Sequence, residues 1–127
     1  MTRVNLVPPA ELHDKHLLAE YRELPRVFGL ARPPRAGEVF PDSYVIGPGH
    51  VKFFYDKLKF LHRRFLSLVE ELAQRGVRLS YPDIPFSGVR PDQVPLYNDY
   101  IPTPEALALN RARLAEHVAT FKRKPAT

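Results

Sequence analysis

Cysteine is absent from this chain of 127 residues. Its absence excludes disulfide bonds, thiolate-bound zinc, iron–sulfur clusters and a cysteine nucleophile. The sequence also has no apolar run of the roughly 20 residues that a membrane-spanning helix needs. Its first residues include charged side chains and lack an apolar core, so we expect no signal peptide. We therefore expect one cytoplasmic domain that covers residues 1–127.

Several motifs of catalysis are missing as well. The segment Gly47-Pro48-Gly49 lacks the strand–loop–helix context of a nucleotide site, and no serine lies in a nucleophile-elbow motif. His13 and His16 would share one helical face, but the sequence offers no third ligand, so we expect neither a metal ion nor an organic cofactor. The remaining histidines are isolated in the sequence and are interpreted as packing or surface residues: His50, His62 and His117.

What the sequence does contain is an excess of positive charge. It has 19 Lys and Arg against 14 Asp and Glu, a net charge of +5. In a small domain such an excess favours a polyanionic partner, although it is also compatible with an ordinary soluble surface. Hydrophobic residues make up 44% of the chain, which is enough for an ordinary core.

Three segments have the apolar spacing of α-helices, and prolines mark most of their ends. The first is expected to open at Pro8-Pro9 and to end or kink at Pro25. The second is expected to follow Gly47-Pro48-Gly49 as one helix of about 25 residues, capped by Gly76. The third is expected to start at Thr103, which is a favourable N-cap residue.

The inner faces of these helices are expected to form one core. Their apolar residues are Leu17, Tyr21, Leu24 and Phe28 in the first helix, Val51, Phe54, Leu58, Leu61, Phe65, Leu68 and Leu72 in the second, and Leu107, Leu114, Val118 and Phe121 in the third. Residues 77–102 are expected to form a long proline-rich loop, and 39–46 is the only β-like stretch. The predicted fold class is all-α: a compact domain of three main helices with this loop, and with the N-terminal segment packed against the first two helices.

The first helix carries a polar sector opposite its apolar stripe. At about 100° per residue, His16 and Glu23 fall in one narrow sector, with Ala19 and Arg26 beside them and Arg22 adjacent. One helix thus presents an imidazole, a carboxylate and two guanidinium groups on its solvent side. From spacing alone, the simpler interpretation is a charged outer face in which Glu23 forms ordinary helix ion pairs.

Basic residues gather in the first third of the chain and along the second helix. Arginine binds phosphate through two parallel hydrogen bonds, and a cluster of arginines can follow a nucleic-acid backbone. A scattered basic surface would have the same composition. The residues are Arg3, Arg22, Arg26, Arg32 and Arg35 in the first third, and Lys52, Lys57, Lys59, Arg63 and Arg64 in the second helix.

The start of the chain carries a further reactive group. Thr2 follows the initiator methionine, and a small second residue permits removal of that methionine. The mature chain would then begin with a threonine α-amine. An α-amino group has a pKa of about 7.7–8.0 and is partly neutral at neutral pH, whereas a lysine amine has a pKa of about 10.4. Because nearly every protein has such an amine, it indicates nothing by itself.

Five stretches of the sequence together resemble the phage-type pyrimidine-dimer DNA glycosylases, which cut DNA at ultraviolet photodimers. The longest stretch, HLLAEYRELPRVFG, closely matches a motif of that family. The resemblance covers most of the chain up to about Leu114. The matching stretches are residues 1–6, 16–29, 49–58, 99–102 and 112–114.

This resemblance implies an all-α enzyme with DNA glycosylase and abasic-site lyase activities, acting on double-stranded DNA with a damaged or modified base. In such enzymes the N-terminal α-amine, here that of Thr2, attacks the anomeric carbon of the damaged nucleotide and displaces the base. The resulting protonated imine permits β-elimination of the 3′ phosphate without a metal. Glu23 matches the catalytic carboxylate, which stabilises developing positive charge and handles protons.

The resemblance also implies which residues hold the DNA. Arg22 and Arg26 match residues near the lesion, Arg3 matches a phosphate contact, and His16 matches a second polar residue of the pocket. The family kinks the duplex and flips out a base opposite the lesion. Nothing in the sequence indicates an oligomer, so we expect a monomer.

The C-terminal end departs from the pattern of the family. The family's aromatic and basic tail has no match here, and the chain has no tryptophan. After Phe121 come Lys122, Arg123 and Lys124, which could contact phosphates through charge alone. The substrate is therefore a pyrimidine dimer or another damaged base. The rival hypothesis from another class is a non-enzymatic DNA-binding module of the same fold.

Overall fold

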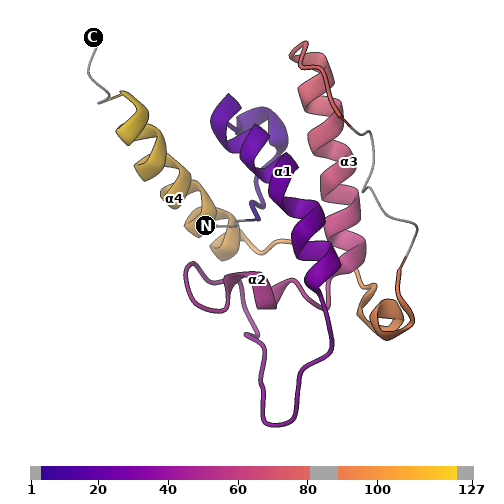
Figure 1. The fold of residues 1–127 in the computed structure, drawn as a ribbon. Helices are drawn as coiled ribbons and strands as arrows, with labels where there is room; N and C mark the ends of the chain where they lie inside the picture. Colours follow the sequence, from indigo (N-terminus) through magenta and orange to yellow (C-terminus); the bar gives the residue numbers. More distant parts are fainter. Residues whose placement is uncertain (1–3, 81–88, 123–127) are drawn as a thin grey trace.

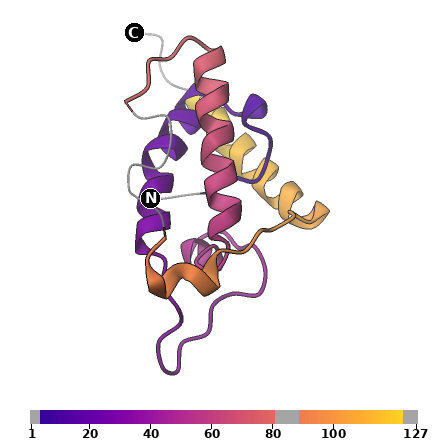
Figure 2. The same cartoon turned by 90° about the vertical axis from the view of Figure 1, so that its right-hand side faces the viewer.

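The computed structural model of the protein describes residues 4–80 and 89–122, with side chains up to residue 119. These ranges contain helices and no strand, which confirms the all-α prediction; the β-like stretch 39–46 is irregular. The helices, where η marks a 3₁₀ helix, are η1 Pro9–Glu11, α1 Asp14–Leu30, α2 His50–Phe53, α3 Leu58–Gln74, η2 Pro91–Leu96 and α4 Pro104–Lys122. The three main helices are α1, α3 and α4 (Figure 1), and in Figure 2 α3 lies in front of α1 and α4.

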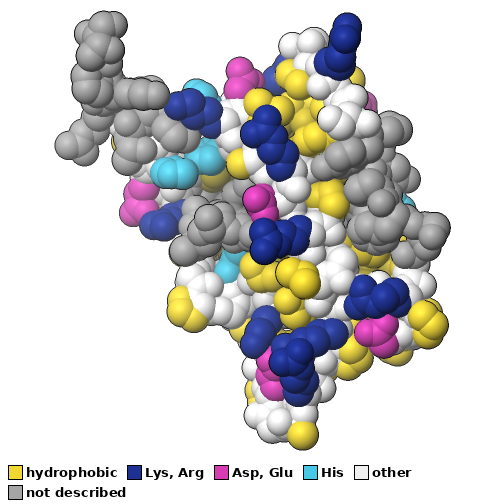
Figure 3. Space-filling view, viewed as in Figure 1, with side chains coloured by type: hydrophobic (Ala, Val, Ile, Leu, Met, Phe, Trp, Pro, Cys, Tyr) yellow, Lys and Arg dark blue, Asp and Glu magenta, His cyan; other side chains and the backbone are white. Residues whose placement is uncertain are grey.

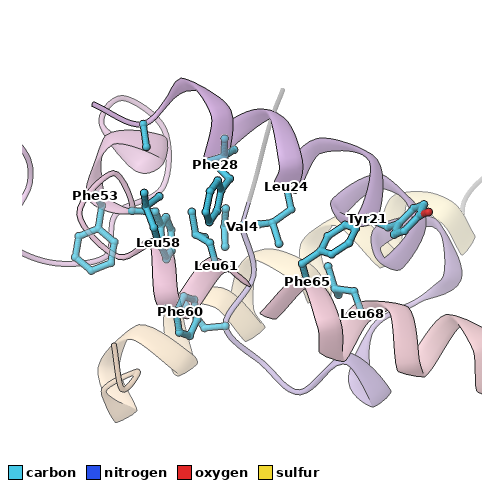
Figure 4. Close-up of a cluster of buried hydrophobic side chains, with 14 of the residues drawn as sticks. Val4, Tyr21, Leu24, Phe28, Phe53, Leu58, Phe60, Leu61, Phe65 and Leu68 are labelled. Atoms are coloured by element: carbon cyan, nitrogen blue, oxygen red, sulfur yellow. The ribbon is translucent and has the colours of Figure 1, made fainter. Parts of the chain in front are cut away.

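The core lies mainly between α1 and α3, which pack against each other (Figure 4). The predicted stripe of α1 and the part of the second stripe that lies in α3 are buried throughout. Tyr21 of α1 stacks on Phe65 of α3, with 5.4 Å between ring centres. Val4 is buried between the two helices, beside Leu24 and Leu61. The N-terminal segment therefore packs against the first two predicted helices, as expected.

The predicted start of the first helix at the proline pair is wrong, because α1 begins at Asp14. Pro9 opens the separate 3₁₀ helix η1, which ends where Leu12 adopts an extended backbone. His13 then caps α1, since its Nδ1 atom accepts a hydrogen bond from the Lys15 N–H at 3.1 Å. This side-chain bond satisfies one of the amides that a helix leaves unpaired in its first turn.

Of the two expected effects of Pro25, an end or a kink of the first helix, the end is wrong, because α1 continues through this residue to Leu30. A proline inside a helix removes one hydrogen bond and clashes with the preceding turn, which costs about 3 kcal/mol. Leu24, Val27 and Phe28 beside it are at most 2% exposed. Burial of each such side chain contributes about 1.5–3 kcal/mol, so the core contacts outweigh the local penalty.

The second predicted helix is in fact two helices, α2 and α3, separated by residues 54–57. Phe53, Phe54 and Tyr55 are all buried. Consecutive residues of one helix point about 100° apart, so a continuous helix could not bury three neighbouring rings on one face. Lys57 stabilises the break: its Nζ atom donates to the Phe53 carbonyl oxygen at 2.9 Å and lies 3.9 Å from the centre of the Phe53 ring.

The proline-rich segment contains the 3₁₀ helix η2, which the sequence did not indicate. Gln93 of η2 donates hydrogen bonds to the carbonyl oxygens of Phe28 and Ala31, at 2.9 and 3.0 Å. Arg90 donates to the Gly29 carbonyl oxygen at 2.7 Å. The last carbonyls of a helix have no partner within it, so η2 serves as a cap for the end of α1. Residues 81–88 of the predicted loop lie outside the described residues.

Helix α4 starts as predicted, because the Thr103 hydroxyl oxygen accepts a hydrogen bond from the Ala106 N–H at 3.1 Å. Its inner face is more polar than predicted, since the buried residues of its described part are Ala106 and Asn110. Phe121 lies outside the residues whose side chains are described. The other predicted inner residues are only partly buried: Leu107, Leu114 and Val118.

Gly76 ends α3 in the left-handed conformation, with φ at +79°. The amides of Gly76 and Val77 donate to the carbonyl oxygens of Ala73 and Leu72, each at 3.0 Å. This pattern is the Schellman motif, in which a residue without a Cβ atom adopts positive φ at no steric cost. The predicted cap is therefore confirmed.

We expect Gly76→Ala to lower the free energy of unfolding by about 1–2 kcal/mol, because a Cβ atom is strained at positive φ. Nothing lies within 4 Å of that Cβ, so the effect isolates the backbone. The matched control is Gly29→Ala, inside α1 and equally open. It should raise stability by about 0.5–1 kcal/mol. Urea denaturation measures both variants, and changes of the same sign would contradict the assignment of Gly76 as the cap.

Candidate active site

A cavity of about 310 Å³ lies where the N-terminal segment, α1 and α4 meet. Two of the predicted site residues, His16 and Glu23, line it together, and both are half-buried. The lining residues are Asn5 from the N-terminal segment, His16, Ala19, Glu20 and Glu23 from α1, and Arg113 and His117 from α4. The cavity thus combines an amide, two imidazoles, two carboxylates and a guanidinium group, which are suited to proton transfer and charge stabilisation.

His16 pairs with His117 across the cavity. The Nε2 atom of His16 lies 2.8 Å from the Nδ1 atom of His117, and the rings stack with 5.0 Å between their centres. One of these nitrogens donates and the other accepts, so the pair links α1 to α4. Figure 3 shows His side chains gathered where α1 approaches α4. The interpretation of His117 as an isolated histidine is therefore wrong.

Glu20, the second carboxylate of the cavity wall, forms a buried ion pair with Arg64 of α3. The two hydrogen bonds measure 2.8 Å from Arg64 Nε to Glu20 Oε2 and 3.0 Å from Nη2 to Oε1. The side chains are only 1% and 5% exposed. Asn5 donates a third hydrogen bond to Glu20 at 2.9 Å, and Arg64 also donates to the Val7 carbonyl oxygen. Such partners offset the desolvation of two buried charges.

Asn110 of α4 extends this buried network to the N-terminal backbone. Its amide nitrogen donates to Asn5 Oδ1 at 2.9 Å. Its carbonyl oxygen accepts from the N–H groups of Leu6 and Val7, at 2.7 and 3.2 Å. Buried backbone amides need such partners, and this segment belongs to no helix or strand. Residues 5–7 are therefore tied to all three main helices beside the cavity.

The sequence analysis did not single out Glu20 or Asn110, and it wrongly counted Arg64 with an exposed basic surface. A signal for two of them existed. Glu20 lies three residues after one leucine of the α1 stripe and four before the next, and Arg64 has the same place between two leucines of α3. A charge at a core position of a helix requires a partner. Opposite charges at such positions on neighbouring helices could have been paired.

Arg22 and Arg26 are exposed on α1, as predicted. Figure 3 shows Lys and Arg side chains spaced along the face that α1 presents. Arg32 differs from them, because its guanidinium group donates to both carboxylate oxygens of Glu38, at 2.6 and 3.1 Å. Of these three arginines, Arg22 and Arg26 are the ones that face solvent on the helix that carries Glu23.

Glu38 gathers cations in the loop between α1 and α2. Besides Arg32, the Lys52 ammonium group lies 2.6 Å from its carboxylate, and the Arg35 N–H donates to it at 3.0 Å. The hydrogen bonds from Arg32, followed by those from Arg35 and Lys52, hold the pKa of Glu38 well below its ordinary value. The charges of Arg32 and Lys52 thus order the loop, and the basic surface predicted from composition is smaller than the count of residues indicates.

Five predicted site residues have side chains outside the described part of the structure. Thr2 and Arg3 lie outside the described residues, as do Arg123 and Lys124, and the side chain of Lys122 is not described. Among the described residues, no group of three or more His, Asp and Glu could hold a metal ion. The helices within these ranges include none that is long and apolar enough to cross a membrane.

A comparison with protein families identifies the family of this chain. A family model described as pyrimidine dimer DNA glycosylase matches residues 1–85, which is more than half of the chain. The chain belongs to this family. It is a DNA repair enzyme with glycosylase and abasic-site lyase activities, and damaged DNA is its substrate. The resemblance of the sequence motifs is confirmed, and the hypothesis of a non-enzymatic module is wrong.

We expect Arg64→Met to lower the free energy of unfolding by about 3–5 kcal/mol, because Glu20 then remains buried without its cation. Chemical denaturation measures this loss. The matched control is Arg111→Met, which removes an ion pair with Glu11 whose side chains are 51% and 43% exposed. That change should cost at most about 1 kcal/mol. Equal losses of unfolding free energy in the two variants would show that the buried ion pair stabilises the protein no more than the exposed one.

Proposed function

We propose that the α-amine of Thr2, exposed when Met1 is removed, is the nucleophile of this glycosylase and lyase, and that Glu23 is the catalytic carboxylate. The supporting observation is that Glu23 and His16 line one cavity together with Asn5. Asn5 follows Thr2 by three residues, and three residues span at most about 11 Å. The amine can therefore reach the cavity that Glu23 lines.

In the proposed reaction, the neutral amine attacks the anomeric carbon of the deoxyribose, and the base leaves with the electron pair of its glycosidic bond. The amine loses a proton, the sugar ring opens, and a protonated imine joins Thr2 to the anomeric carbon. Removal of a proton from the neighbouring carbon then expels the 3′ phosphate. Glu23 stabilises the positive charge that develops on the sugar and moves protons during elimination.

The DNA is proposed to lie along the face of α1 that carries Arg22 and Arg26, because these exposed guanidinium groups flank Glu23 in the sequence of one helix. His16 is proposed to contribute to the pocket, where it already contacts His117. The two reacting groups, the Thr2 amine and the Glu23 carboxylate, belong to one chain. We therefore propose that the single domain acts as a monomer. We also propose that it acts on cytoplasmic DNA and without a cofactor. The further proposed phosphate contacts are Arg3, Lys122, Arg123 and Lys124.

The proposed lesion is a pyrimidine dimer or another damaged base. The name of the matching family favours the dimer. The match ends at residue 85, however, and α4 with its two cavity residues lies beyond it. Cleavage assays on dimer-containing, oxidised and simply abasic duplexes distinguish these substrates: selective cleavage of the dimer assigns it as the lesion, and cleavage of the oxidised duplex alone excludes it.

We expect Glu23→Gln to lower the rate of strand cleavage about 10²–10⁴-fold, as removal of a general acid–base group does, while DNA binding is retained. Single-turnover cleavage and fluorescence anisotropy measure the two quantities. The matched control is Glu70→Gln, at an exposed position of α3, which should cleave like the unchanged protein. Unaltered turnover in Glu23→Gln would defeat the assignment of this carboxylate.

We expect borohydride to trap a covalent complex between the processed protein and abasic DNA, because it reduces the imine to a stable amine. A protein with one additional residue before Thr2 should form no such complex. Mass spectrometry verifies the chain start of each sample, and removal of the added residue by a protease should restore trapping. Robust trapping with the extension still attached would exclude Thr2 as the nucleophile.

A further inference from the structure

His50 and Tyr44 hold both polar groups of the Val4 backbone. The Nε2 atom of His50 accepts a hydrogen bond from the Val4 N–H at 2.8 Å. The Tyr44 hydroxyl donates to the Val4 carbonyl oxygen at 3.2 Å. All three residues are buried, so these hydrogen bonds do not compete with bulk water. Val4 is the first described residue and lies two positions after Thr2.

The hydrogen bonds of His50 define its tautomer. Its Nδ1 atom lies 2.7 Å from the Val45 carbonyl oxygen, which can only accept, so Nδ1 carries the proton. Nε2 is then the nitrogen without a proton and is able to accept from Val4. The rings of Tyr44 and Phe54 pack against the imidazole in T-shaped arrangements, with 5.3 and 5.7 Å between ring centres. The ring is therefore held with its acceptor directed at Val4.

The glycines before His50 explain how it reaches this place. Gly47 and Gly49 have φ of +90° and +85°, a conformation in which a Cβ atom is strained. A Cβ atom on Gly49 would lie only 2.8 Å from Cγ of Pro41. Gly49 is also the N-cap of α2, and His50 is the first residue of that helix. The Gly47-Pro48-Gly49 motif, which is not a nucleotide loop, thus directs His50 towards the chain start.

We propose that His50, assisted by Tyr44, is a positioning residue for the N-terminal amine of the reaction. It fixes the backbone two residues away from Thr2 and so restricts where the amine lies relative to Glu23. This inference rests on the proposed role of Thr2 as nucleophile. A reaction is faster when the reacting group is already held in position, and a misplacement of about 1 Å can slow it about 10²-fold. His50 acts only through the chain and not by contact with the sugar.

The test compares two variants of His50 in protein from which Met1 has been removed. His50→Phe keeps an aromatic ring but has no acceptor, whereas the side-chain oxygen of His50→Gln can replace Nε2. Borohydride trapping of abasic duplex DNA at saturating enzyme gives the rate constant of imine formation, and anisotropy gives the dissociation constant. His50→Phe should lower the rate constant about 10²-fold without changing the dissociation constant. His50→Gln should recover most of the rate.

A matched control separates positioning from a general loss of stability. Leu72→Ala removes a buried side chain from the far end of α3, so it destabilises the fold without touching Val4. It should trap DNA at the unchanged rate. The proposal is overturned if Leu72→Ala slows trapping as much as His50→Phe does, or if folded His50→Phe traps at the unchanged rate.

A milder variant keeps the test decisive if His50→Phe does not fold. Tyr44→Phe deletes only the hydroxyl that donates to Val4, and it should slow trapping about tenfold with unchanged DNA affinity. An unchanged rate in this variant would show that the hydrogen bond from Tyr44 to Val4 does not help to position the amine. Failure of the proposed nucleophile has a different signature, since the N-terminally extended protein would then still be trapped. If the N-terminally extended protein is not trapped, but the variants of His50 and Tyr44 trap DNA at the normal rate, only the positioning role is overturned.

Discussion

The buried ion pair between Glu20 and Arg64 is the interaction on which the arrangement of the chain start depends. Burial of either charge alone would be strongly unfavourable, so each requires the other and the polar groups around it. Asn5 and the Val7 carbonyl oxygen belong to that set of partners. If the N-terminal segment left its place, Glu20 and Arg64 would therefore lose hydrogen bonds that these buried charges require. This coupling ties the stability of the α1–α3 core to the geometry of the cavity.

Two anchors from different parts of the chain hold the N-terminal segment. Asn110 of α4 binds the backbone of residues 6 and 7, and His50 of α2 binds that of Val4. A chain end held at consecutive residues loses most of its conformational freedom before substrate arrives. The same α1 that carries Glu23 into the cavity presents Arg22 and Arg26 to solvent. The fold thus brings a restrained N-terminal segment, a carboxylate and cationic groups to one helix, an arrangement that supports the proposed amine chemistry.

Much of the fold could be predicted because helix signals are local. The apolar stripes of α1 and α3, the Thr103 cap and the Gly76 cap depend on residues within a turn or two of each other, and the structure confirms them. Two of the wrong predictions were those in which distant contacts outweighed a local preference. Pro25 remains helical because its neighbours are buried in the core. The break at residues 54–57 exists because consecutive aromatic side chains all enter the core.

The sequence by itself determined the all-α class, the family and the residue types of the chemistry, because motifs and periodicity are properties of the linear chain. Only the tertiary structure decided which polar groups meet. His16 with His117, His50 with Val4 and Glu20 with Arg64 are separated by 101, 46 and 44 residues. No helical or strand period connects positions so far apart, since their contact depends on how the helices pack. Side chains that the sequence left as isolated histidines or surface charges therefore became partners only through the packing of the helices.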